Sequence, residues 1–127
     1  MLKVLLVTAI KENFFDFAKE IEKQKDAIVL WTDLGQKALD MVSVSPVDLV
    51  VADENLKDMT GLQLALRLLS VNPMVNCSVV SSLDAEQFHE ASEGLGLMSQ
   101  LLPHPVAEQA VELLVRLKEI NNLTLKI

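Results

Sequence analysis

The sequence has no tyrosine, and aromatic residues make up only 4% of its 127 residues. Aliphatic side chains must therefore pack the hydrophobic core, and hydrophobic residues make up half of the chain. Charged residues contribute 23%, which is typical of a globular domain rather than of a disordered chain. We expect one domain over residues 1–120, followed by a C-terminal tail or linker over residues 121–127.

Cysteine and long hydrophobic runs are also scarce. Cys77 is the one cysteine, so no internal disulfide can form, and its apolar surroundings predict a buried, unreactive thiol. No apolar run approaches the roughly 20 residues of a membrane-spanning helix. No small-residue cleavage site follows the short apolar stretch at the N-terminus. These absences predict a cytoplasmic protein that does not bind a membrane.

Positive charge is the third shortage. The chain has 11 Lys and Arg against 18 Asp and Glu, which gives a formal net charge of −7. Sequence-independent binding of nucleic acid needs a basic surface that displaces counterions from the phosphates. This composition therefore argues against nucleic acid as a partner of the domain. The acidic residues are scattered along the sequence, which favours a solubilising role.

Short apolar runs alternate along the chain with segments of helical spacing. Nearly continuous apolar runs are typical of strands covered on both faces, as in a parallel sheet. Strict alternation with helices predicts right-handed crossovers and helices on both sides of the sheet. The predicted fold is α/β, a single doubly wound (βα)5 domain with a five-stranded parallel sheet. The expected strands are residues 3–7, 28–31, 49–52, 77–80 and 100–102, and the expected helices lie near residues 14–21, 38–42, 61–70, 84–94 and 106–120.

Polar residues follow several of the predicted strands directly. Ligands of doubly wound sheets bind beyond the carboxyl ends of the strands. Asp53 ends the apolar run LVVA, Ser81 follows the fourth strand and His104 follows the fifth, while Thr8 and Ala9 follow the first. We expect these residues at one edge of the sheet, although a lone aspartate there also fits a solvated strand end.

The segments around these strand ends resemble a response-regulator receiver domain of the CheY-like type over nearly the whole chain. DLVVADENLKDMTGLQL is similar to the phosphoacceptor segment, VVSSLDAEQF to the fourth strand and its helix, and LLPHPV to the fifth strand, where Lys-Pro is usual. The resemblance implies the flavodoxin-like strand order 2-1-3-4-5. It also implies a two-component phosphorelay, in which a histidine kinase phosphorylates an aspartate that binds Mg²⁺ together with an acidic pair and a backbone carbonyl.

The resemblance assigns roles to individual positions. Asp53 matches the phosphoacceptor, Ser81 the hydroxyl switch and the carbonyl of Asn55 the backbone ligand of Mg²⁺. Thr8 and Ala9, however, replace the acidic pair, and neither offers a carboxylate. His104 replaces the usual lysine.

These replacements predict a weak phosphorylation site. A doubly charged phosphoryl group and a carboxylate 4 Å apart repel by about 8 kcal/mol at an effective dielectric near 20. Mg²⁺ normally cancels this repulsion, but here we expect no bound metal or other cofactor, and slow or absent phosphorylation of Asp53. Glu12 or Asp16 could rebuild a metal site only by reaching in from the first helix.

His104 suggests a further arrangement at the same edge. With one imidazole facing one carboxylate, His104 is predicted to pair with Asp53 and to make the site sensitive to pH. The resemblance also favours a cis bond between His104 and Pro105. An enzymatic alternative is a hydrolase triad of Asp53, Ser81 and His104. No G-x-S-x-G motif surrounds Ser81, which argues against it.

The leading prediction is a degenerate receiver domain that is not an enzyme and acts as a protein-interaction module. Its interaction face is expected on the fourth helix, fifth strand and fifth helix, with a histidine kinase, an effector domain or another output protein as partner. The alternative is a phosphorylatable response regulator that accepts a phosphoryl group on Asp53 with the help of Mg²⁺. A homodimer is left open. Leu95, Leu97, Met98 and Leu101 are expected to be buried in the core, with an exposed apolar patch for a partner as the alternative.

Overall fold

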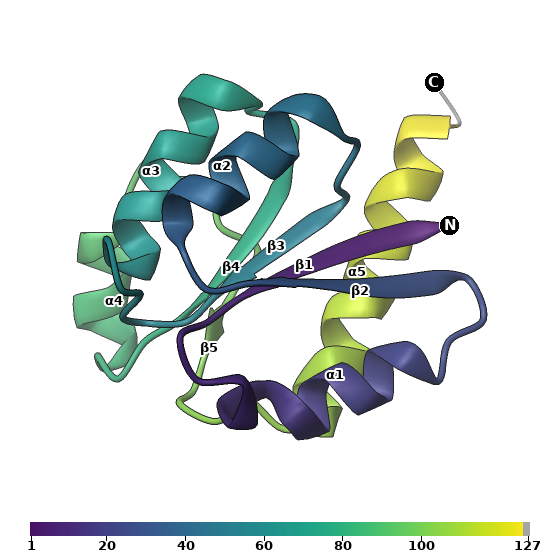
Figure 1. Cartoon of the computed structure of the whole chain (residues 1–127), viewed down its shortest axis with the longest axis horizontal. Helices are drawn as coiled ribbons and strands as arrows, with labels where there is room; N and C mark the ends of the chain where they lie inside the picture. Colours follow the sequence, from purple (N-terminus) through teal and green to yellow (C-terminus); the bar gives the residue numbers. More distant parts are fainter. Residues whose placement is uncertain (126–127) are drawn as a thin grey trace.

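The computed structural model describes residues 1–125 and the side chains of residues 1–120. Within this range five strands alternate with five α-helices (Figure 1). All strand pairs are parallel, and the sheet order is β2-β1-β3-β4-β5. The predicted fold class and strand order are therefore confirmed. The strands are β1 (Leu2–Val7), β2 (Ala27–Thr32), β3 (Leu49–Ala52), β4 (Asn76–Val80) and β5 (Gln100–Leu101).

The helices lie in two layers: α2, α3 and α4 cover one face of the sheet, and α1 and α5 cover the other (Figure 1). The longest helix continues beyond residue 120 to Leu125, so the predicted boundary falls inside a helix, and residues 126–127 of the predicted tail lie outside the described residues. None of the helices described has the length and hydrophobicity of a transmembrane span. The helices are η1 (a 3-10 helix, Lys11–Phe14), α1 (Phe15–Glu22), α2 (Gly35–Val44), α3 (Gly61–Val71), α4 (Ala85–Ala91) and α5 (Ala107–Leu125).

Each face of the sheet has its own hydrophobic cluster. Successive side chains of a strand point to opposite faces. In β1, Val4 and Leu6 join the cluster under α1 and α5, whereas Leu5 and Val7 join the cluster under α2 and α3. All four side chains are fully buried. This two-sided burial explains why the central strands are continuously apolar in the sequence.

The first helix buries one apolar face. Phe14 and Phe17 pack edge to face with their ring centroids 5.9 Å apart, and Ala18 and Ile21 lie in the same cluster. Phe14 itself, however, ends η1 rather than beginning α1. The chain therefore makes a tighter turn before α1 than the helical spacing predicted.

Capping boxes start α3 and α4. In the box at Asp84, the Gln87 N–H donates to Asp84 Oδ1 at 2.8 Å, and the Gln87 side chain accepts from the Asp84 N–H. A second box, formed by Thr60 and Gln63, was not anticipated. It fixes the start of α3 directly after the loop that follows Asp53.

The segment around β5 is partly buried rather than forming the exposed apolar patch. Leu101 is buried, and Leu95, Leu97 and Met98 are half-buried against the two clusters. By contrast, α4 has a single buried side chain, Phe88. The helix that borders β5 is therefore attached mainly through one aromatic ring.

The turn after β5 differs from the expectation. The bond between His104 and Pro105 is trans, like all peptide bonds within the described residues, so the predicted cis bond is wrong. The backbone of His104 instead has φ = 55°, a left-handed conformation that is uncommon for a residue with a side chain. This local conformation makes the turn.

Candidate functional site

Asp53 lies at the carboxyl end of β3 and is held by three hydrogen bonds. Its Oδ2 accepts from the Thr8 hydroxyl at 2.7 Å and from the Asn13 amide at 3.1 Å. Its Oδ1 accepts from the N–H of Glu54 at 2.9 Å. The side chain is half-buried. All three of these donors are neutral groups.

Thr8 and Ala9 occupy the end of β1, as predicted, but only one of them faces Asp53. Thr8 is 2% exposed, and its hydroxyl oxygen also accepts the N–H of Ile10 at 3.0 Å. Ala9 is exposed to solvent. The structure thus places a buried hydroxyl beside the carboxylate, where the resemblance expects an acid.

Asn13 is the residue of this site that sequence reasoning missed. It lies in η1, and the 3-10 turn directs its amide to Asp53. A polar side chain among Phe14, Phe15 and Phe17 was the available signal, because an apolar segment rarely includes an amide without a partner.

The lysines of the neighbouring loops are engaged elsewhere. Lys11 lies over the ring of Trp31, with Nζ 5.0 Å from the centroid. Lys57 forms an ion pair with Asp33 at 3.1 Å. Among the described side chains, no Lys, Arg or His forms an ion pair with Asp53.

The donor set around Asp53 does not fit a Mg²⁺ site. Mg²⁺ requires several oxygen ligands in octahedral geometry and usually at least one or two carboxylates. Residues 1–125 contain no group of three or more His, Cys, Asp and Glu side chains that could hold a metal. Glu12 is exposed, and Asp16 lines a groove between α1 and α5, so neither extends the site. Asn55, whose carbonyl was the expected backbone ligand, forms an isolated bridge with Thr60 in the loop that follows Asp53.

Glu54, the residue after Asp53, connects the site to the β4–α4 loop. Its Oε2 accepts from the N–H of Ser82 at 2.7 Å and from the Ser82 hydroxyl at 2.9 Å. From the other side, the Gln100 amide donates to the carbonyl oxygens of Ser81 and Leu83 at 3.1 and 2.7 Å. The loop is therefore held by a side chain from each neighbouring strand end.

Ser81 is buried at the end of β4, but within the described residues its hydroxyl forms no hydrogen bond with Asp53. Its hydroxyl oxygen accepts the N–H of Leu83 at 3.2 Å, within its own loop. The hydroxyl at the predicted switch position is thus engaged locally.

The loop between Asp53 and α3 is fixed against α2. Asp58 Oδ1 accepts the N–H of Gly35 at 2.8 Å, and Oδ2 accepts the N–H of Gln36 at 3.0 Å. These hydrogen bonds, first from Gln36 and then from Gly35, lower the pKa of the exposed Asp58 carboxyl. The loop closes at Gly61, where an added Cβ would overlap the carbonyl oxygen of Asp53 and the side chain of Val79.

His104 does not form the predicted pair with Asp53. His104 is exposed, and among residues 1–120 the side chains that donate to the Asp53 carboxylate are those of Thr8 and Asn13. Among the described side chains, no hydrogen bond joins Ser81 to His104 or His104 to Asp53, so an Asp53–Ser81–His104 triad is not formed. The left-handed backbone at His104 determines the direction of its side chain in a way that spacing does not reveal.

Comparison with known proteins identifies the family of the chain. The family model described as response regulator receiver domain matches residues 4–116. None of the curated proteins compared with the sequence matches it.

Several solved structures share the fold. The signal receiver domain of an HD domain-containing protein from Pseudomonas fluorescens Pf-5 has a TM-score of 0.83 at 15% identity, covering 98% of this chain and 92% of that one. The response regulator domain of Thermotoga maritima CheB gives 0.76 at 16%, covering 94% and 95%. The chemotaxis response regulator CheY4 of Vibrio cholerae gives 0.79 at 18%, covering 92% and 98%. At these identities the similarity shows the fold alone.

Proposed function

The chain belongs to the response regulator receiver domain family, and on that premise we propose that it is a degenerate receiver domain. It acts as a protein-interaction module whose binding surface does not require phosphorylation of Asp53. Receiver domains of two-component systems interact with histidine kinases and effector domains. We propose a protein of one of these kinds as the partner and the face of α4, β5 and α5 as the contact surface.

The observation that carries the proposal is the neutral environment of Asp53. The Thr8 hydroxyl and the Asn13 amide both donate to Oδ2, the oxygen that an incoming metal ion or phosphoryl group would have to share. Their hydrogen bonds satisfy one carboxylate without any cation. A phosphoryl group would bring charge for which this site offers no partner, and the repulsion of about 8 kcal/mol would remain.

The β4–α4 loop supports the second half of the proposal. Glu54 and Gln100 hold this loop from its two sides without a phosphoryl group. The loop leads directly into α4, so these contacts define where α4 begins. We infer that the α4–β5–α5 face is available to a partner in the unmodified protein.

The alternative function is a phosphorylatable response regulator. The observation in its favour is Asp53 itself, which is half-buried at the carboxyl edge of the sheet and follows β3 directly. It would require Thr8 and Asn13 to release Oδ2 when Mg²⁺ arrives.

A titration separates the two functions. The backbone amide NMR spectrum is recorded with Mg²⁺ up to millimolar concentrations, then with beryllofluoride, a phosphoryl mimic. We expect no saturable shifts at residues 8–13, 53–61 or 81–83, either in the wild type or in the Asp53→Asn control. Saturable shifts in the wild type that Asp53→Asn abolishes would establish the phosphorylatable regulator instead.

A further inference from the structure

The positive charge of the chain is distributed very unevenly. From residue 68 to residue 115 the sequence contains no Lys or Arg. The same stretch has six of the eighteen acidic residues, so it accounts for six of the seven units of net negative charge. The acidic residues are scattered along the whole sequence, whereas the basic residues that could balance them are missing from this stretch. The six are Asp84, Glu86, Glu90, Glu93, Glu108 and Glu112.

All six carboxylates are exposed. Five of them belong to α4 and its two ends or to the part of α5 beside β5, whereas Glu108 lines the groove between α1 and α5. None of them forms an ion pair with a Lys or Arg among the described side chains. Exposed charge of one sign gives a surface potential that attracts the opposite sign.

The same face contains a pocket that is partly lined by apolar side chains. A hollow of about 410 Å³ lies between α4 and the segment that leads into β5, and Ala85, Phe88 and Leu97 contribute its apolar wall. Glu93 and His89 line it as well. A smaller hollow of about 70 Å³ lies between β5 and α5, and there Glu112 lies beside Arg116, so the unbalanced charge is greatest around α4.

We propose that this face docks a partner segment that is rich in lysine or arginine and inserts apolar side chains into the hollow beside Phe88. The inference rests on the proposed function and names the chemistry of its partner. Apolar contacts at the floor and opposite charges at the border are the usual composition of a specific protein interface.

The other occupants fit less well. In a twofold contact with a second copy, the same acidic face would meet itself, and like charges brought together oppose association. Nucleic acids and anionic lipid surfaces carry the same sign of charge as the face.

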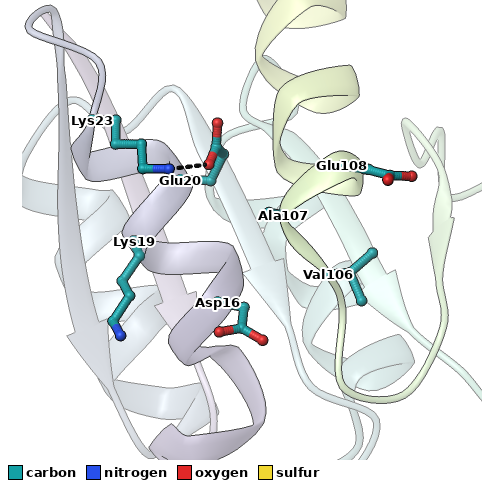
Figure 2. A pocket seen from close by; sticks show the side chains of 7 residues that line it. All are labelled: Asp16, Lys19, Glu20, Lys23, Val106, Ala107 and Glu108. Atoms are coloured by element: carbon teal, nitrogen blue, oxygen red, sulfur yellow. Dashed lines mark hydrogen bonds and ion pairs between the residues drawn. The ribbon is translucent and has the colours of Figure 1, made fainter.

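The opposite side of the molecule provides a matched comparison. A groove of about 470 Å³ separates α1 from the start of α5 (Figure 2). There Lys19 and Lys23 lie among Asp16, Glu20 and Glu108, and Lys23 pairs with Glu20 at 3.1 Å. A groove of similar size thus has nearly balanced charge, so a basic segment gains little there.

The test uses the full chain and synthetic peptides at physiological ionic strength. The probe is an amphipathic helical peptide with a leucine stripe flanked by lysines. One control peptide has glutamates in place of the lysines, and another has serines in place of the leucines. Affinity is measured by calorimetry, and the contact surface is mapped by backbone amide shifts.

Two double variants change the net charge equally. Glu90→Lys with Glu93→Lys alters the proposed face, and Asp16→Lys with Glu22→Lys alters exposed positions on α1. We expect the basic peptide to shift amides of α4 and β5, and its affinity to fall about tenfold or more in the first variant. The second variant should lose no more than about threefold, the part due to net charge alone. Both control peptides should bind much more weakly than the probe.

Equal losses in the two variants, shifts centred on α1, or equal binding of the serine peptide would overturn the proposal. Dimerisation of the wild type that the first variant alters would also overturn it, in favour of a second copy as occupant.

The measurement is repeated with Mg²⁺ and beryllofluoride. Binding that appears only then would keep the partner chemistry but contradict the phosphorylation-independent function. If the peptide binds in neither condition, the proposed partner chemistry is wrong. The phosphorylation-independent function would then be judged by the Mg²⁺ and beryllofluoride titration alone.

Discussion

The Thr8 hydroxyl lies 2.7 Å from Oδ2 of Asp53. A neutral donor thus occupies the place where the receiver pattern has an acid. The nearest side chain therefore stabilises the Asp53 carboxylate instead of repelling it, and this changes the expected sign of several mutational effects.

Asp53→Asn should destabilise the protein. The amide supplies one oxygen where the carboxylate supplies two, so Thr8, Asn13 or the Glu54 N–H loses its acceptor. We expect a loss of about 1–3 kcal/mol in the free energy of unfolding, measured by urea denaturation. Thr8→Val and the double variant complete a mutant cycle, which should give a coupling energy of about 0.5 kcal/mol or more. A site crowded with acids would instead be stabilised by this change, and that result would contradict the structure.

Thr8→Asp should create a dependence on Mg²⁺. A second buried carboxylate beside Asp53 would cost up to about 4 kcal/mol at 4 Å and an effective dielectric near 20. We expect the melting temperature to fall in EDTA and to recover with millimolar Mg²⁺. Thr8→Asn is the matched control, because it has the same shape without the charge and should respond to neither. A Thr8→Asp protein indifferent to Mg²⁺ would show that the remaining ligands cannot complete a site.

Glu54→Ala should loosen the β4–α4 loop. It removes the acceptor of both the Ser82 N–H and the Ser82 hydroxyl. Hydrogen exchange of the amides at residues 82–88 should accelerate, whereas exchange in α1 should not change. Glu54→Gln retains an acceptor oxygen and should show a smaller effect, and Ser82→Ala should remove only the hydroxyl contact. If all three variants exchange like the wild type, then Gln100 alone holds the loop.

Asp58 should make stability depend on pH in the acidic range. Hydrogen bonds from the N–H groups of Gln36 and Gly35 lower its pKa below the ordinary 3.8. The unfolded chain therefore takes up a proton first, so the contribution is present above pH 3.8 and is lost as pH falls through the folded-state pKa. Asp58→Asn should flatten the fall of the unfolding free energy in acid.

Asp33 contributes with the same sign, because the hydrogen bond from Lys57 is the main cause that lowers its pKa. Lys57→Met should remove part of the remaining slope. Urea denaturation at a series of pH values measures both effects. Unchanged slopes in both variants would mean that other carboxylates govern acid unfolding.

Cys77 should be unreactive in the folded protein. Burial raises the pKa of its thiol to about 12, whereas its ordinary value is 9.0. A thiol-specific reagent should modify it only at the rate at which the surrounding structure opens, and urea should accelerate the reaction. The raised pKa contributes stability below pH 9.0 that is lost as pH rises from there toward 12. Rapid modification under native conditions would contradict the burial.

The sequence predicted the fold because burial on both sides of the sheet leaves a pattern that spacing can detect. The bounds of β3 and the buried stripe of Phe14, Phe17, Ala18 and Ile21 follow from that pattern. η1 was missed because a 3-10 turn and the first turn of an α-helix place similar residue types at similar spacing.

The sequence predicted which residues of the site lie at strand ends, but not which side chains hydrogen-bond to one another. Thr8, Asp53 and Ser81 follow their strands as expected, since strand order places them on one edge. Asn13 and Glu54 act through the direction of their side chains, which depends on local backbone conformation rather than on spacing. For the same reason His104, with its left-handed backbone, is not the partner of Asp53.

The contact between Lys11 and Trp31 gives this molecule an intrinsic optical probe. Trp31 is the one tryptophan in a chain without tyrosine, so nearly all of its fluorescence comes from a single indole. Lys11, whose ammonium lies over that indole, begins the short turn that also contains Asn13. Any event that draws Asn13 away from Asp53 should disturb that turn and change the emission, so the state of the carboxylate can be followed without a label.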